Sequence, residues 1–105
     1  MKYAICYITA SSDKEVEKIA DMLLEKRLIA CANMFPIKSK YWWKGKIVKS
    51  KEVLMFCKTQ MSKSQEIIKE VRKIHSYDTP CINFIPVGKG SPDFLKWVDK
   101  ELSPK

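Results

Sequence analysis

Apolar residues follow two different periods along this chain, and the changes between them divide it into elements. Residues 2–10 (KYAICYITA) are rich in β-branched and aromatic side chains on both alternating faces, which predicts a strand buried on two sides. Residues 12–27 then place apolar side chains at helical spacing. Ser12 followed by Glu15 forms the pattern of a capping box, so we expect an amphipathic helix to begin there.

The stretch from Ile29 to Thr59 contains one strong turn signal, Lys44-Gly45. Glycine tolerates the positive φ that a two-residue hairpin loop requires, so two long strands are expected to meet at this point. Such a loop fixes the pairing of the two strands. It predicts that Tyr41 lies opposite Val48, Phe35 opposite Leu54 and Asn33 opposite Phe56.

The second half of the chain predicts a helix, a strand and a last helix. A second capping-box pattern, Ser62 with Gln65, opens a helix that ends around residues 75–77. A strand follows at residues 81–87, and Ser91 and Pro92 open the last helix. The order βαββαβ with a terminal helix predicts one α+β domain, residues 1–105, with the ferredoxin-like sandwich.

Both faces of the predicted hairpin are apolar. One face carries Ile29, Cys31, Asn33, Phe35, Leu54 and Phe56, and the other carries Ala30, Ala32, Met34, Val53, Met55 and Cys57. Two helices of a ferredoxin-like sandwich cover only one face of the sheet. The last helix or another copy of the chain must therefore cover the second face, and we favour a homo-oligomer.

Residues 38–51 form the far half of the hairpin and hold six lysines beside Tyr41, Trp42 and Trp43. Aromatic side chains at the tip of a projecting arm indicate docking onto a neighbouring subunit. The alternative is that they fold back on the core of their own chain. The register also sets Lys40 opposite Lys49, a like-charge pair that either meets acids of a partner or protects the strand edges.

Charge adds a second class of function to consider. Lys and Arg outnumber Asp and Glu by 20 to 12, giving a net charge of +8. This charge makes nucleic acid, anionic lipid and an acidic protein candidate partners. An RNA-recognition domain shares the element order, but residues 52–59 lack the aromatics of its third strand. The sequence shows no signal-peptide pattern and no run approaching the ~20 apolar residues of a membrane span, so we expect a cytoplasmic protein.

Candidate chemistry centres on four cysteines and one histidine. Cys6, Cys31, Cys57 and Cys81 form no Cys-x-x-Cys pair, and small core hydrophobes explain them better than a metal or redox site. His75 continues the apolar stripe at the end of its helix. It is either a helix-ending side chain bonded to a carbonyl or carboxylate, or a metal ligand or base. No nucleophile or phosphate-loop motif is present, and we do not expect an enzyme.

Several of these stretches together resemble the CutA family of divalent-cation tolerance proteins. They are ACAN (30–33), SKYWWKGKI (39–47), Glu52, KT (58–59), HSYDTPCI (75–82) and FLKW (94–97), in the order and spacing of that family. The resemblance implies a ferredoxin-like homotrimer similar in plan to the PII signalling proteins, with hairpin arms that reach across subunits through Tyr41, Trp42 and Trp43. It also implies tolerance to copper and other divalent cations, and no established enzymatic reaction.

The resemblance further implies a metal site and a ligand cleft. His75 matches a histidine that contributes to copper binding in some members, with Cys6 and Cys31 as further candidate ligands. Ile74 and Ile8 stand where other members offer a second histidine and a cysteine, so copper or another divalent cation is expected to bind weakly. By analogy with PII, a small anionic ligand would bind between subunits near Lys58, Tyr77, Trp42 and Trp97.

Overall fold

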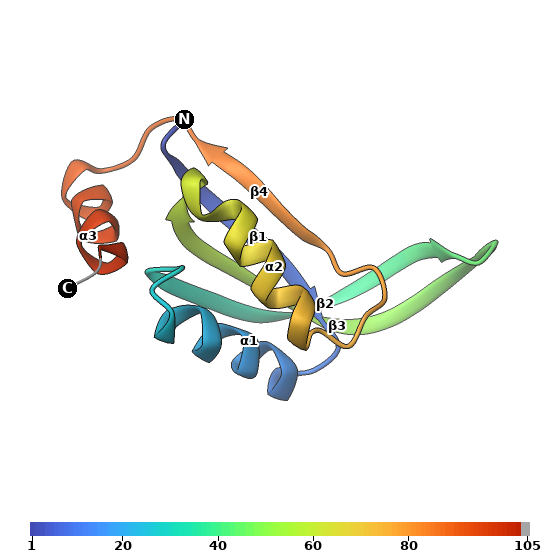
Figure 1. Cartoon of the computed structure of the whole chain (residues 1–105). Helices are drawn as coiled ribbons and strands as arrows, with labels where there is room; N and C mark the ends of the chain where they lie inside the picture. Colours follow the sequence, from blue (N-terminus) through green and yellow to red (C-terminus); the bar gives the residue numbers. More distant parts are fainter. Residues whose placement is uncertain (104–105) are drawn as a thin grey trace.

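An antiparallel sheet of strand order β2-β3-β1-β4 forms the centre of the computed structural model, which describes residues 1–103 (Figure 1). The elements follow in the order β1 (Tyr3–Ala10), α1 (Asp13–Glu25), β2 (Cys31–Trp43), β3 (Lys46–Gln60), a 3-10 turn (Met61–Lys63), α2 (Ser64–Ile74), β4 (Ile82–Val87) and α3 (Pro92–Leu102). This arrangement confirms the predicted α+β, ferredoxin-like sandwich with an additional C-terminal helix. Within these residues no helix has the length and apolar character needed to cross a membrane.

The start of α1 forms half of the predicted capping box. Ser12 occupies the N-cap, and its Oγ accepts a hydrogen bond from the backbone N–H of Glu15 at 3.2 Å. The Glu15 carboxylate does not return to the N–H of Ser12. It accepts instead from the N–H and the hydroxyl of Ser11, at 3.1 and 2.8 Å. This leaves the second carboxylate oxygen free for a contact distant in the sequence.

The predicted capping box at the start of α2 is wrong. Ser62 lies within the 3-10 turn, and α2 begins two residues later, at Ser64. The N-cap of α2 is Lys63, which makes no side-chain capping bond. The 3-10 turn continues directly into α2, so the helix begins from this turn and not from a serine N-cap.

The β2-β3 hairpin has the predicted turn and register. Lys44 and Gly45 both adopt positive φ, at 50° and 78°, and Tyr41 pairs with Val48 as expected. The outer half of the hairpin extends past the other strands as an arm (Figure 1), and the molecule measures 45 Å along its longest axis. The side chain of Trp42 is 71% exposed. The arm therefore projects, and this tryptophan does not fold back onto the core of its own chain.

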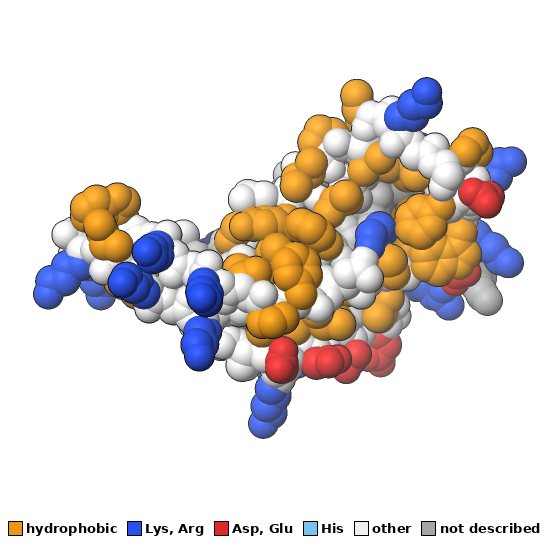
Figure 2. Space-filling model, turned by 180° about the vertical axis from the view of Figure 1, so that it is seen from behind, with side chains coloured by type: hydrophobic (Ala, Val, Ile, Leu, Met, Phe, Trp, Pro, Cys, Tyr) orange, Lys and Arg blue, Asp and Glu red, His pale blue; other side chains and the backbone are white. Residues whose placement is uncertain are grey.

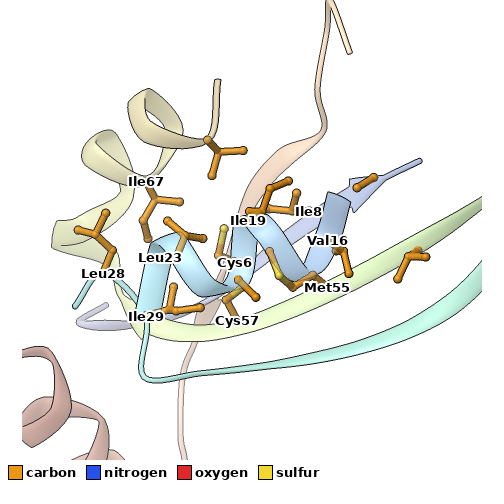
Figure 3. Packing of buried hydrophobic residues seen from close by; sticks show 14 residues of the cluster. Cys6, Ile8, Val16, Ile19, Leu23, Leu28, Ile29, Met55, Cys57 and Ile67 are labelled. Atoms are coloured by element: carbon orange, nitrogen blue, oxygen red, sulfur yellow. The ribbon is translucent and has the colours of Figure 1, made fainter. Parts of the chain in front are cut away.

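One face of the sheet packs against α1 and α2 to form the main hydrophobic core (Figure 3). The strands contribute Cys6, Ile8, Met55 and Cys57, and the helices contribute Val16, Ile19, Leu23, Ile67 and Val71, all of them buried. Their alternation along each strand and their helical spacing along each helix direct both sets of side chains to the same layer.

The other face of the sheet is covered only at one end (Figure 2). There α3 packs Val98 and Leu102 against Ala30 and Tyr3. Ala30 lies in this small cluster and Ile29 in the main core, the reverse of their predicted faces, because regular strand pairing in β2 begins only at Cys31. Elsewhere on this face large apolar side chains stay accessible, among them Phe35 at 41% and Ile85 at 48%.

Candidate functional site

His75 ends α2 and is held in one orientation by bonds to both ring nitrogens. Nε2 donates to the backbone carbonyl of Thr9 at 2.8 Å, and Nδ1 accepts from the backbone N–H of Tyr77 at 3.1 Å. A carbonyl can only accept and an N–H can only donate, so the ring carries its proton on Nε2. The His75 side chain is fully buried. Of the two interpretations of this histidine, the helix-ending one describes its contacts in a single chain.

Glu15 links the start of α1 to the corner that follows α2. Beyond its bonds to Ser11, its carboxylate accepts the backbone N–H of Ser76 at 2.7 Å and the Ser76 hydroxyl at 3.0 Å. It lies 3.8 Å from Nδ1 of His75. Burial alone would raise the pKa of Glu15, but the hydrogen bonds from Ser11 and Ser76 outweigh it and lower the pKa to about 2. An ionised carboxylate therefore clamps this corner.

Tyr77 extends from the same corner to the base of the arm. Its hydroxyl donates to Oε2 of Glu52 at 2.7 Å. Burial, together with this bond to a carboxylate, raises the pKa of Tyr77, so the hydroxyl keeps its proton and acts as the donor. Glu52 is buried within β3. From the sequence, Glu52 was identified only as part of the family pattern. The signal that could have indicated a buried carboxylate is an acidic residue followed directly by the apolar run VLMF.

Two cavities open on the face of the sheet away from α1 and α2. The larger, of about 930 Å³, lies between the base of the arm and the corner after α2, and Trp42, Glu52 and Tyr77 contribute to its wall. The smaller, of about 150 Å³, lies beside α3 and is lined mainly by apolar residues, with Lys58 and Thr59 among the others. The larger cavity brings the hairpin, β1 and the Tyr77 corner together, and it is the candidate ligand site.

The three predicted metal ligands do not meet within one chain. Cys6 is fully buried in the main core, and burial raises the pKa of its thiol to about 12, which disfavours the thiolate form that binds metals. Cys31 pairs with Lys58 in the sheet and lies on the opposite face, as does every second residue from it. Over residues 1–103 no three His, Cys, Asp or Glu side chains cluster closely enough to hold a metal ion. Metal binding stays a prediction.

The four residues predicted to line a ligand cleft are divided between different places in one chain. Trp42 and Tyr77 both line the larger cavity. Lys58 lines the smaller cavity and donates a hydrogen bond to Oδ1 of Asn33. Trp97 lies on α3, half-exposed, with its ring 5.5 Å from that of Phe94. Within one chain the four residues therefore do not line a single cavity.

Comparison with known proteins gives consistent matches over nearly the whole chain. The family model described as CutA1 divalent ion tolerance protein matches residues 4–101. The divalent-cation tolerance protein CutA of Archaeoglobus fulgidus is 52% identical over 96 residues, covering 91% of this chain and 94% of the relative. That of Thermotoga maritima is 42% identical over 98 residues, covering 93% of this chain and 97% of the relative.

A solved structure agrees with the sequence relatives. The structure of the periplasmic divalent cation tolerance protein CutA from Archaeoglobus fulgidus superimposes with a TM-score of 0.95 at 48% identity. The match covers 96% of this chain and 99% of that one. Fold, length and sequence therefore point to the same family.

Proposed function

This chain belongs to the CutA1 divalent ion tolerance family, and we propose that it acts as a homotrimer that binds a metal ion weakly and a small ligand between its subunits. The observation that carries the proposal is the family match over residues 4–101, which includes the arm and the exposed sheet face. The names of the relatives carry no enzymatic activity, and the proposed role requires no catalysed reaction.

The exposed apolar face supports the assembly. Helix α3 covers one end of this face and leaves Phe35, Ile85 and the middle of the sheet open (Figure 2). A monomer that exposed a patch of this size would be prone to aggregate. Burying the same face against further copies of the chain removes the patch and gives each subunit a second core.

The arm supports the same assembly. Trp42 pairs across the hairpin with Ile47, and their side chains are 71% and 63% exposed. Tyr41 and Trp43, on the neighbouring positions, are also exposed. We expect these aromatics to dock onto a neighbouring subunit, where they would contribute most of the contact energy of the arm.

Substitutions in the arm test this role. Trp42→Ala is expected to shift the protein from three times the chain mass toward monomer on dilution, as measured by sedimentation equilibrium. Leu24→Ala removes another exposed apolar side chain, on α1 and far from the arm, and should leave the mass unchanged. Equal masses for all three proteins at every concentration would exclude Trp42 from the interface.

We propose that soft divalent cations bind through His75 together with a thiol. Both ring nitrogens are already bonded, so a metal ion must displace the N–H of Tyr77 from Nδ1 or break the bond to Thr9. Losing such a bond opposes coordination, which favours weak binding. The thiol is that of Cys6 or Cys31. Cys31 lies on the sheet face that we propose to be covered by another subunit.

Calorimetric titration with Cu(II) tests the metal site. His75→Ala is expected to weaken copper binding. Lys73→Ala, two residues earlier in the last turn of α2, should not alter it. Titrations with the same affinity in the wild-type protein and in His75→Ala would remove His75 from the site. The corresponding Cys6→Ser and Cys31→Ser proteins assign the thiol.

A small anionic ligand is proposed for the cleft between subunits. Lys58 is half-buried at the wall of the smaller cavity and would provide the charge, with Tyr77, Trp42 and Trp97 coming from more than one subunit. Pyrophosphate is a suitable probe. Its binding should fall in Lys58→Gln, and binding that is equal in both proteins would exclude this lysine.

A cytoplasmic location remains part of the proposal. All four cysteines are free thiols, which is typical of a reducing compartment. The structural neighbour from Archaeoglobus fulgidus is itself described as periplasmic. Cell fractionation followed by immunodetection distinguishes the two compartments.

A further inference from the structure

The arm leaves the sheet at Glu52. Strand β1 pairs with β3 only as far as Ala10, which lies opposite Val53. Beyond that pair, residues 46–52 of β3 have β2 as their single partner strand, so the four-stranded sheet becomes a two-stranded ribbon (Figure 1). Two-stranded ribbons twist more strongly than wider sheets and are only marginally stable by themselves. Strand pairing alone therefore determines the direction of the arm weakly.

One side-chain contact joins this ribbon to the rest of the chain. The Tyr77 hydroxyl donates to Oε2 of Glu52 at 2.7 Å. Among the side-chain hydrogen bonds and ion pairs within residues 1–103, it is the only one that connects residues 37–52 to residues outside that range. The contact lies at the root of the arm, where a small change in angle moves the tip furthest.

Glu52 is a costly residue for this position. It is 8% exposed, and within residues 1–103 its carboxylate accepts this one hydrogen bond and forms no ion pair. A buried acid with so few partners costs more free energy than an apolar side chain of similar size. Its neighbours Val53 and Leu54 are buried apolar residues, as the strand pattern requires. A departure from that pattern is expected where a residue has a task other than stability.

The corner after α2 holds Tyr77 in place. The N–H of Tyr77 donates to Nδ1 of His75 at 3.1 Å, and the two rings lie 4.8 Å apart. His75 is bonded in turn to the carbonyl of Thr9 at the end of β1. The N–H of Ser76 donates to Glu15 at the start of α1. The Tyr77 hydroxyl therefore extends to the arm from a point that is fixed to β1 and to α1.

We propose that the contact between Tyr77 and Glu52 is a latch that fixes the direction of the arm relative to the sheet. A hydrogen bond to a carboxylate is short and strong, so one such bond at the root holds the ribbon in one orientation. Any event at the corner that moves Tyr77 acts on the arm through the latch. With the latch closed, the arm is already ordered for docking; with the latch open, docking has to order the ribbon first and is weaker.

The effect on docking rests on the proposed assembly, whereas the latch itself uses contacts within one chain. Backbone order parameters from NMR relaxation test it in the protein as it assembles. Tyr77→Phe keeps the ring and removes the donor. The order parameters of residues 46–51 should fall from about 0.85 in the wild type to about 0.6 or lower, while residues 5–8 of β1 stay near 0.85. Order parameters report motion within the folded state, so a variant that is merely less stable would leave them unchanged.

Variants of both partners separate the latch from other roles of Tyr77. Glu52→Leu removes the acceptor and should mobilise residues 46–51 as Tyr77→Phe does. Glu52→Gln keeps an oxygen that accepts the Tyr77 hydroxyl, so its loss of order should be smaller. Tyr7→Phe is the matched control, because Tyr7 is a half-buried tyrosine on β1 whose hydroxyl forms no hydrogen bond within residues 1–103. It should leave the arm as ordered as in the wild type.

The wild-type measurement does not depend on the folding of any variant. A wild-type arm with order parameters below about 0.6 would overturn the latch, because the closed contact would then not hold the ribbon. Equal order of residues 46–51 in the wild type, Tyr77→Phe and Glu52→Leu would overturn it as well. The mass of the wild-type protein, measured on the same sample, judges the proposed assembly separately: a monomer with an ordered arm would refute the assembly and keep the latch.

Discussion

Glu15→Gln is the sharpest perturbation of the corner that holds His75 and Tyr77. In the native protein both carboxylate oxygens accept bonds, from the N–H and hydroxyl of Ser11 and from those of Ser76. A glutamine offers one oxygen and one NH₂ group. Its NH₂ group would face an N–H or hydroxyl donor whichever way the amide turns, so at least one bond becomes a contact between donors.

The lowered pKa of Glu15 sets the size of the effect. Its pKa falls from the ordinary 4.5 to about 2, and one pKa unit corresponds to about 1.4 kcal/mol, so the ionised carboxylate stabilises the fold by about 3 kcal/mol. The side chain is 12% exposed, which leaves little screening by solvent. A carboxyl with a depressed pKa contributes this stability above pH 4.5 and loses it as the pH falls through about 2.

Urea unfolding at a fixed protein concentration measures the difference, because the stability of an assembly depends on concentration. Near neutral pH, Glu15→Gln should lower the free energy of unfolding by about 2–3 kcal/mol, and the gap to wild type should close toward pH 2. Glu17→Gln, an exposed acid on the same helix, should change stability by less than about 0.5 kcal/mol. Equal stability of Glu15→Gln and wild type, or a gap independent of pH, would refute the clamp.

Other substitutions test separate parts of the fold. The Thr59 hydroxyl donates to a buried carbonyl at 2.7 Å, so Thr59→Val should cost about 1–3 kcal/mol in urea unfolding, against no measurable change for the exposed Thr79→Val. Gly45 has a φ of 78°, so Gly45→Ala should destabilise the hairpin by about 1 kcal/mol, seen as a lower urea midpoint; an unchanged midpoint would contradict the turn. Burial raises the pKa of the Cys6 and Cys57 thiols, which should therefore react with a disulfide reagent only in denaturant; rapid reaction of both in the folded protein would argue against their burial.

Local sequence signals were sufficient for the fold. The Lys44-Gly45 loop determined the register of the whole hairpin, because a two-residue turn leaves one way to align the strands. Apolar spacing located all three helices. The predicted N-cap at Ser62 was wrong for a local reason. A 3-10 turn moves the first residue of α2 to Ser64, so Ser62 does not occupy the N-cap.

Contacts between distant residues were not predictable in the same way. Glu15 was expected to cap its own helix, yet its second partner, Ser76, is 61 residues away. Tyr77 and Glu52 are 25 residues apart and meet only because the corner after α2 passes the end of β1 on its way to β4. The spacing of apolar residues along the chain does not predict such contacts. The family resemblance did include both Tyr77 and Glu52 in its matched stretches, but it did not indicate that they touch.

The oligomeric state tests the central claim most directly, since the exposed sheet face, the arm and the clefts acquire their proposed roles only in an assembly. Native mass spectrometry or sedimentation equilibrium of the unmodified protein should give three times the chain mass of 12.2 kDa over a wide range of concentration. A mass of 12.2 kDa at every concentration would contradict the account, because the apolar face and Trp42 would then remain exposed in the functional protein.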